Sequence, residues 1–281
     1  MTTDPFPLSA FGDEAGASIT DQVSALVESG ILGLDVRSVD GVNVLAMSQD
    51  ALEATRDACK AAGRHIQAVG SPINKVHFSH DTHSAESEKL QRAIHAARIL
   101  GTNKIRIFTP ETPPHQGPAA WAELKPVMNT MVSMAADADM VLIHENDGHY
   151  YGAFPEHAKR LFGEIGGPHF KAAFDFANTV LIGFRPMRDW FPWLLPHLDT
   201  LHVKDAVEAK HEVVAAGEGD GELVETIRFL ISQNWHGTLT LEPHLKAAGP
   251  LGGFSGPELF AFAAKKMKEV AIEAGGSVVR A

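Results

Sequence analysis

VLIHE (141–145), KAAFD (171–175), DTLHV (199–203) and LTLE (239–242) are the stretches of sequence that decide the fold. Each is a short apolar run with the length of a buried strand. Each run ends at or beside a residue that can bind a metal, and these residues are Glu145, Asp175, His202 and Glu242. Successive runs are separated by one strand-plus-helix unit, roughly 30 residues or more. One such residue at the same end of successive strands is how a barrel assembles a site for a divalent cation.

Strand-like and helix-like segments alternate along the whole chain. Strands are predicted at 8–12, 31–37, 65–70, 104–108, 140–145, 171–175, 200–204 and 238–242. Helices are predicted at 18–30, 48–63, 84–101, 119–138, 154–165, 187–196, 222–233 and 257–274. Strict alternation of eight strand–helix units predicts an α/β fold, a single (β/α)8 TIM barrel over residues 1–281. A doubly wound sheet is the main alternative, but no early strand–helix turn carries the G-x-G-x-x-G loop typical of one.

Alternation within the strands predicts which side chains line the barrel. Residues two apart on a strand share a face. On each strand, the inward face carries two of these residues: Glu242 and Thr240 on one, His202 and Lys204 on the next, and Arg106 with Phe108 and Asp35 with Arg37 on two others. The aliphatic residues between them would meet the helices. The pattern therefore predicts a polar interior, with a polar site at the C-terminal mouth of the barrel.

Composition and charge limit the class of protein. The formal net charge is −11 and there is no Lys/Arg run, which argues against a nucleic-acid partner. Cys59 is the only cysteine, so a disulfide framework and a cysteine-rich zinc site are excluded. The N-terminus lacks the pattern of a signal peptide, and no apolar run approaches the ~18 residues of a membrane span. We therefore expect a cytoplasmic protein without a membrane partner.

The quartet Glu145, Asp175, His202 and Glu242 combines three carboxylates with one imidazole. Three carboxylates at a barrel mouth would repel one another strongly, so a divalent cation is their simplest partner. A site of mostly oxygen ligands suits Mn²⁺, which we expect first, and also Mg²⁺ or Co²⁺; Zn²⁺ is a further possibility.

The strings HENDGHYYG, FDFAN, LHVKD, GEGDG and LEPHL together resemble the sugar phosphate isomerase/epimerase family, the xylose isomerase-like barrels. The resemblance implies that the quartet binds the metal and that Glu145 and Glu242 also serve as the catalytic acid/base pair. It further implies proton abstraction next to the carbonyl of a sugar or keto-sugar, through an enediolate. Return of the proton gives epimerisation or isomerisation, whereas loss of a β-substituent is elimination.

One departure from the family bears on the reaction. Ketose 3-epimerases of this family usually carry an arginine a few residues after the metal histidine, and HVKDAVEAKHEV has none. The motifs look closer to a branch with lyases of 3-keto-glycosides, among them C-glycoside deglycosidases, in which His144 would be a candidate catalytic base. Strand alternation argues against that role, because His144 should face away from Glu145.

Five further residues are expected to bind substrate. Lys204 could contact a hydroxyl or oxyanion, or form an ion pair with Glu145 or Asp175. Arg37 and Arg106 could clamp the substrate or balance the metal-binding carboxylates.

His244 shares the face of Glu242 and could reach the substrate, and Tyr150 could wall the sugar site. The glycine-rich GEGDG segment (217–221) is predicted to be a rim loop and not a phosphate cradle.

We rank a metal-dependent sugar isomerase or epimerase first and a 3-keto-glycoside lyase second. An AP-endonuclease-like metal hydrolase would need more histidine ligands and a basic DNA-binding face, which the charge of −11 opposes. A barrel that binds metal without catalysis is the last alternative. The sequence leaves open a homo-oligomer or a small accessory subunit that completes the site.

Overall fold

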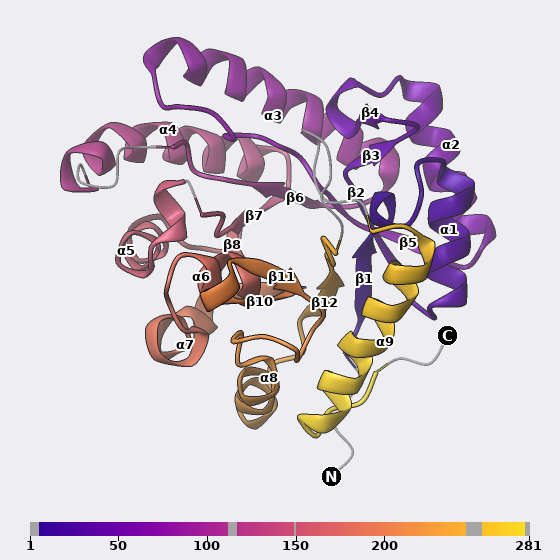
Figure 1. Cartoon of the computed structure of the whole chain (residues 1–281). Coiled ribbons are helices and arrows are strands. Elements are labelled where there is room, and N and C mark those ends of the chain that lie inside the picture. Colours follow the sequence, from indigo (N-terminus) through magenta and orange to yellow (C-terminus); the bar gives the residue numbers. More distant parts are fainter. Residues whose placement is uncertain (1–5, 112–116, 149, 246–254, 279–281) are drawn as a thin grey trace.

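The computed structural model describes residues 6–111, 117–148, 150–245 and 255–278. Within these ranges, eight parallel strands close into a barrel in the order β1-β12-β9-β8-β7-β6-β5-β2 (Figure 1). The barrel strands are β1 (Leu8–Phe11), β2 (Gly33–Val36), β5 (His65–Val69), β6 (Lys104–Ile107), β7 (Val141–Glu145), β8 (Phe170–Asp175), β9 (Leu198–Val203) and β12 (Thr238–Leu241). The predicted barrel is confirmed, and every predicted strand is present with small shifts at its ends.

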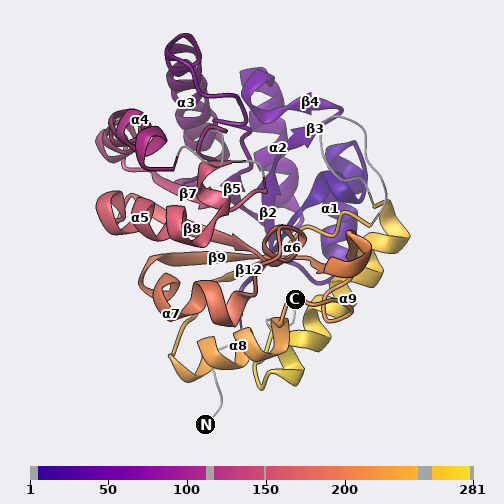
Figure 2. The same ribbon diagram turned by 60° about the vertical axis from the view of Figure 1, so that its left-hand side comes forward.

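Helices surround the barrel (Figures 1 and 2). They are α1 (Ile19–Glu28), α2 (Gln49–Ala61), α3 (His80–Leu100), α4 (Gly117–Asp137), α5 (Pro155–Ile165), α6 (Phe176–Leu181), α7 (Phe191–Leu194), α8 (Leu223–Ser232) and α9 (Pro257–Glu273). Ser18 and Ser48 cap α1 and α2, because each hydroxyl accepts a backbone N–H of the first turn. In the part of the chain that the structure describes, no helix is both long and apolar enough to cross a membrane.

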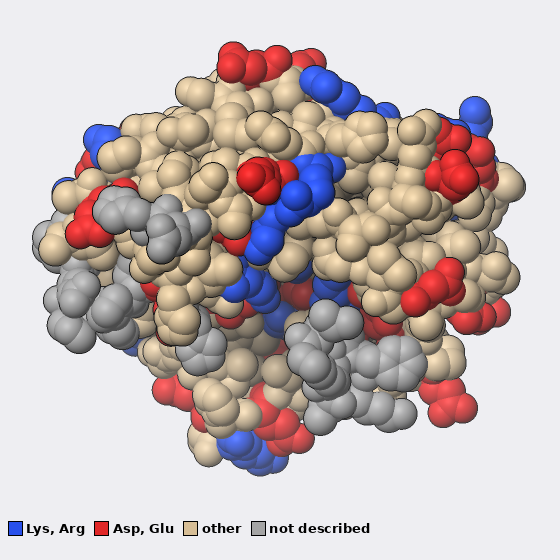
Figure 3. All heavy atoms as spheres, turned by 90° about the horizontal axis from the view of Figure 1, so that it is seen from above, with Lys and Arg blue, Asp and Glu red and all other residues tan. Residues whose placement is uncertain are grey.

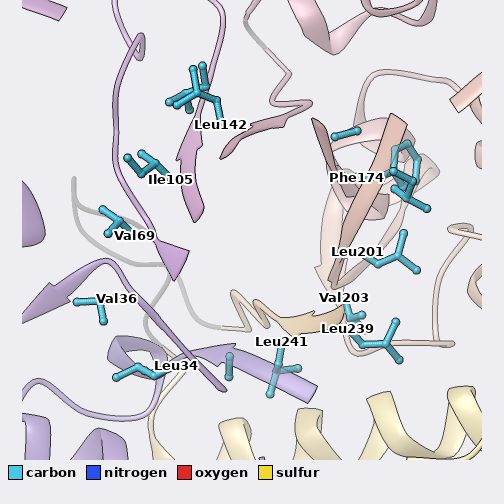
Figure 4. Packing of buried hydrophobic residues seen from close by; sticks show 14 of the residues in the cluster. Leu34, Val36, Val69, Ile105, Leu142, Phe174, Leu201, Val203, Leu239 and Leu241 are labelled. Carbon is cyan, nitrogen blue, oxygen red and sulfur yellow. The ribbon is translucent and has the colours of Figure 1, made fainter. Parts of the chain in front are cut away.

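The aliphatic faces of the strands pack against the helices, as their alternation predicts. Leu34, Val36, Ile105 and Leu142 have no exposed surface and join one cluster with helix residues such as Leu161. Figure 4 shows these strand side chains among the buried neighbours of the cluster. Burying one such side chain stabilises the fold by about 1.5–3 kcal/mol.

The barrel interior is polar over much of its length. Lys104 Nζ lies 2.7 Å from Asp199 Oδ2. Closer to the mouth, Ser9 donates a short hydrogen bond to buried Asp35. Burial raises the pKa of Asp35 to about 6, although the bond from Ser9 opposes the shift. A small apolar cluster of Ala68, Ile143 and Ala173 lies apart from the main core.

The chain departs from strict alternation in three places, one divided helix and two added hairpins. The helix expected at 187–196 is split into a π-helical turn (Pro186–Trp190), α7 and a 3-10 turn (Leu195–His197). Pro192 and Pro196 lack the N–H that a continuous helix requires, which explains the division. Two hairpins were not predicted: β3 (Ser38–Val39) with β4 (Val42–Asn43), and β10 (Asp205–Val207) with β11 (Glu212–Val214).

Candidate metal centre

The quartet converges at the C-terminal mouth of the barrel. Glu145 and Asp175 are the last residues of β7 and β8, His202 lies in β9, and Glu242 directly follows β12. The register places His202 between Asp175 and Thr240 on its two neighbouring strands. One ligand atom from each quartet member lies within 4.8 Å of the others, and all four residues are buried. This is the arrangement predicted for a divalent-cation site.

The imidazole of His202 provides a test of whether a cation fits. Its Nδ1 lies 3.4 Å from Glu145 Oε2 and 3.3 Å from Glu242 Oε2. Neither ring nitrogen makes a hydrogen bond, although the side chain is completely buried. A buried polar group without a partner costs about 1–3 kcal/mol. A cation among the four ligand atoms would give one of the two ring nitrogens a partner, so the donor set fits a metal.

Three fixed cations surround the carboxylates. Lys204 Nζ lies 3.0 Å from Asp175 Oδ2 and 3.4 Å from Glu242 Oε2. Arg106 Nη1 lies 3.0 Å from Glu145 Oε2.

Arg37 contacts three carboxylates, those of Asp13, Glu14 and Glu242, at 2.8, 2.9 and 3.2 Å. Both arginines therefore lie where they balance the carboxylate charge, and Lys204 forms an ion pair with Asp175 of the kind considered from the sequence.

These contacts set the protonation states of the quartet. Burial favours the neutral form of Glu145, but Arg106 and His202 outweigh it and lower its pKa to about 2. Burial raises the pKa of Asp175 to about 6 against the opposing effect of Lys204. Burial alone would lower the pKa of His202, but Glu145 and Glu242 raise it to about 10. Binding of a cation must therefore displace a proton from His202.

A cavity of 340 Å³ opens above the quartet. Ligand pockets usually begin at about 300 Å³. The residues that line it are Arg37, Gly70, Pro72, Lys75, Arg106, Glu145, Asp147, Asn178, Lys204, Glu242 and His244. Seen from above, the molecule has a central hollow with Lys and Arg side chains gathered around it (Figure 3). Of the quartet, only Glu145 and Glu242 line the cavity.

His244 lies at the side of this cavity. Its Nε2 is 3.1 Å from Glu14 Oε1 and 3.4 Å from Glu242 Oε1. Burial would lower the pKa of His244, but Glu242 and Glu14 raise it above its ordinary value. Glu14 is itself fully buried. His244 thus lies where a substrate hydroxyl could meet it.

Tyr150 lies outside the set of residues that line the cavity. Its ring centroid is 5.6 Å from that of Phe108, and the side chain is half-buried. Burial raises the pKa of Tyr150 to about 12, so the phenol keeps its proton and can donate a hydrogen bond. The ring of Tyr150 therefore lies against Phe108 and does not form part of the cavity wall.

His144 occupies the opposite side of β7 from Glu145. Its ring packs among Phe162 and Phe170, with centroids 5.9 and 6.0 Å away, and its Nε2 lies 3.3 Å from Thr109 Oγ1. This placement corrects the expectation that His144 is a catalytic base, because adjacent strand residues point to opposite faces. Burial lowers its pKa to about 4, so His144 is a neutral core residue.

Sequence reasoning did not assign Lys75, Asp147 and Asn178 to the site. Lys75 Nζ lies 2.8 Å from Asp147 Oδ2, which joins the loops after β5 and β7 across the cavity. Asn178 donates from its backbone to Asp175 Oδ1 at 2.7 Å and from its side chain to Glu145 Oε1 at 3.2 Å. Asp147 and Asn178 belong to the motifs HEND and FDFAN, but only the folded turns bring them to the ligands.

Comparison with known proteins places this chain in a family. Three solved structures are similar over nearly their whole lengths. A D-tagatose 3-epimerase-like protein shares 15% identity over 95% of this chain and 96% of that chain, with a TM-score of 0.75. The 3-keto-D-glucoside 4-epimerase of E. coli shares 14% over 94% and 99%, with a TM-score of 0.73. A xylose isomerase-like TIM barrel protein from Mycobacterium smegmatis, in complex with magnesium, shares 14% over 98% of each chain, with a TM-score of 0.68.

At these identities, the likeness to solved structures establishes the fold. A comparison with curated protein sequences found no match. The sequence itself matches the family described as xylose isomerase-like TIM barrel over residues 23–269, which is most of the chain. The chain therefore belongs to the xylose isomerase-like TIM barrel family.

Proposed function

We propose that this protein is a divalent-metal-dependent isomerase or epimerase that acts on a sugar or keto-sugar by abstracting a proton next to a carbonyl. The observation that carries the proposal is that two of the four quartet residues line the cavity and the other two do not. Asp175 and His202 lie beneath the cavity, whereas Glu145 and Glu242 line it. Two carboxylates are therefore within reach of a bound substrate. The similar structures named as epimerases support this class of reaction.

The two glutamates approach the cavity from different directions. Glu145 ends β7 and Glu242 follows β12, and β8 and β9 lie between these strands in the barrel. One carboxylate can remove a proton from one side of a substrate carbon, and the other can return it from the opposite side. In the substrate-free site, Arg106 and His202 lower the pKa of Glu145, and Lys204 and His244 lower that of Glu242 against its burial. Both carboxylates therefore start as bases, and the one that delivers a proton must first take it from water or from a substrate hydroxyl.

Glu145, Asp175, His202 and Glu242 would hold the metal ion. When bound, the ion would polarise the substrate carbonyl and stabilise the negative charge that develops on its oxygen. Asn178 fixes the Glu145 carboxylate through its side-chain amide. Lys204, Arg37 and His244 present N–H donors at the cavity wall, where they can orient sugar hydroxyls.

Deuterium exchange tests this proposal. The Mn²⁺-loaded enzyme is incubated with unphosphorylated ketoses in D₂O, and deuterium at carbon is measured by NMR. Exchange without loss of a substituent is expected for the wild type. Glu242→Gln should keep the fold and lose exchange, since the amide cannot accept the proton. Wild-type rates in Glu242→Gln would remove Glu242 from the mechanism.

A second candidate is β-elimination from a 3-keto-glycoside. The position of His244 favours it, because Glu14 and Glu242 hold a proton on this ring at the cavity wall and a leaving group needs a proton donor. Release of an aglycone from a 3-keto-glycoside, lost in His244→Gln, would support elimination. Exchange without release supports isomerisation or epimerisation.

A further inference from the structure

The glycine-rich loop 217–221 folds around the carboxylate of Asp205. Asp205 Oδ1 accepts the backbone N–H groups of Ala206 and Gly221, both at 2.8 Å. Its Oδ2 accepts those of Gly217 at 3.1 Å and Gly219 at 3.0 Å. The side chain is buried, with 1% of its surface exposed. Four backbone donors on one buried carboxylate form an anion-binding nest.

The glycines of this loop are required by the close approach of the carboxylate. A Cβ at Gly219 would lie 2.3 Å from the carbonyl oxygen of Ala206, and a Cβ at Gly221 would lie 2.6 Å from Asp205 Oδ1. Gly217 has a φ of +82°, which disfavours other residues. The loop thus has the backbone of an anion cradle, but the anion is a side chain of the protein itself. The backbone N–H groups that could bind an external anion are therefore already used by Asp205.

The nest is joined to the candidate metal centre by two direct connections. Asp205 immediately follows Lys204, whose Nζ contacts Asp175 and Glu242. Ala206 packs against Ala177 and Val180 of α6. The same short helix carries Asn178, which hydrogen-bonds the carboxylates of Asp175 and Glu145.

We propose that Asp205 is a positioning residue for the metal centre. By anchoring the loop to the end of β9, it holds α6 in place, so that Asn178 keeps the carboxylates of Asp175 and Glu145 oriented and the affinity for the cation is maintained. This inference rests on the proposed function in that it takes the quartet as a cation site; it needs no particular sugar. Residues around metal ligands change affinity by about 10- to 100-fold when they are replaced.

The test compares Asp205→Asn and Asp205→Ala with Asp220→Asn. Asp220 belongs to the same loop, but its side chain is exposed and accepts a single N–H, from Glu208 at 2.9 Å. Mn²⁺ affinity of the metal-free proteins is measured by titration calorimetry well below their unfolding temperatures. Asp220→Asn should bind like the wild type, whereas both Asp205 variants should bind about 10-fold or more weakly. Formate, but not chloride at equal ionic strength, should restore part of the affinity of Asp205→Ala by entering the nest.

A purely structural role would give a different result. Folded Asp205 variants with a lower unfolding temperature and wild-type Mn²⁺ affinity would overturn the inference. If they do not fold, Gly221→Ala replaces them, because its Cβ strains the same nest against side-chain atoms only. Weaker binding by this variant supports the inference, and wild-type affinity overturns it. A wild type that binds no divalent cation would instead refute the proposed function, and this inference with it.

Discussion

Replacing His144 by leucine separates a core role for this ring from a catalytic one. The folded protein keeps His144 neutral down to about pH 4, whereas an unfolded histidine takes up its proton near 6.5. The unfolded state therefore binds more protons between these values, and the contribution of His144 to stability is lost as the pH falls through this range. A shift of this size corresponds to roughly 3 kcal/mol. His144→Leu removes the titration and should flatten the pH dependence by that amount.

Urea unfolding of the metal-free proteins, followed by tryptophan fluorescence at neutral pH and at about pH 4, measures the effect. The difference between wild type and variant cancels the other titrating groups, such as Asp35. Thr109 keeps its hydrogen bond from the Gly152 N–H in the variant, so no buried hydroxyl is left without a partner. Turnover of the metal-loaded variant should stay within a few-fold of the wild type. An unchanged pH dependence, or a folded variant that has lost turnover, would refute the placement of His144 in the core.

Three further predictions follow from the site and the core. Asn178→Ala removes the side-chain N–H from Glu145 and should lower kcat by about 10-fold with little change in unfolding temperature; an unchanged kcat would deny Asn178 its orienting role. Cys59 is buried and its pKa is raised to about 11, so a thiol reagent should modify it only on unfolding, and fast labelling of the native protein would contradict this burial. Mn²⁺ at 100 times its Kd should raise the free energy of unfolding by about 2.7 kcal/mol. The affinity for Mn²⁺ should increase with pH because His202 must lose a proton. If a chelator leaves the free energy of unfolding of the Mn²⁺-loaded protein unchanged, Mn²⁺ is not bound.

The fold was largely predictable because its signals are local. Each barrel strand is a short apolar run, and side-chain alternation already separates the outward face of Leu241 from the inward face of Glu242. Serines at the starts of α1 and α2 and Gly101 at the end of α3 mark the helix boundaries by known capping chemistry. The start of α3 lies earlier than expected. Ser79 and Thr82 form a reciprocal cap, and this cap begins the helix ahead of the predicted residue 84.

The convergence of Glu145, Asp175, His202 and Glu242 was also predictable, since parallel strands bring their C-terminal ends to one edge of the barrel. What escaped prediction depends on contacts between loops that are distant in sequence. Lys75 and Asp147 pair across the cavity, and the loop at 217–221 closes on Asp205. Asp205 was visible in the motif HVKD, but its four backbone partners depend on the path of a loop that no local pattern encodes.

Metal content is the measurement that tests the central claim most directly. The protein is loaded with Mn²⁺, dialysed to remove free ion and analysed for metal beside His202→Leu, which removes the one imidazole from the quartet. We expect one ion per chain in the wild type and a large loss in the variant. A wild type without bound metal, or a folded variant that retains the full amount, would contradict the assignment of the quartet.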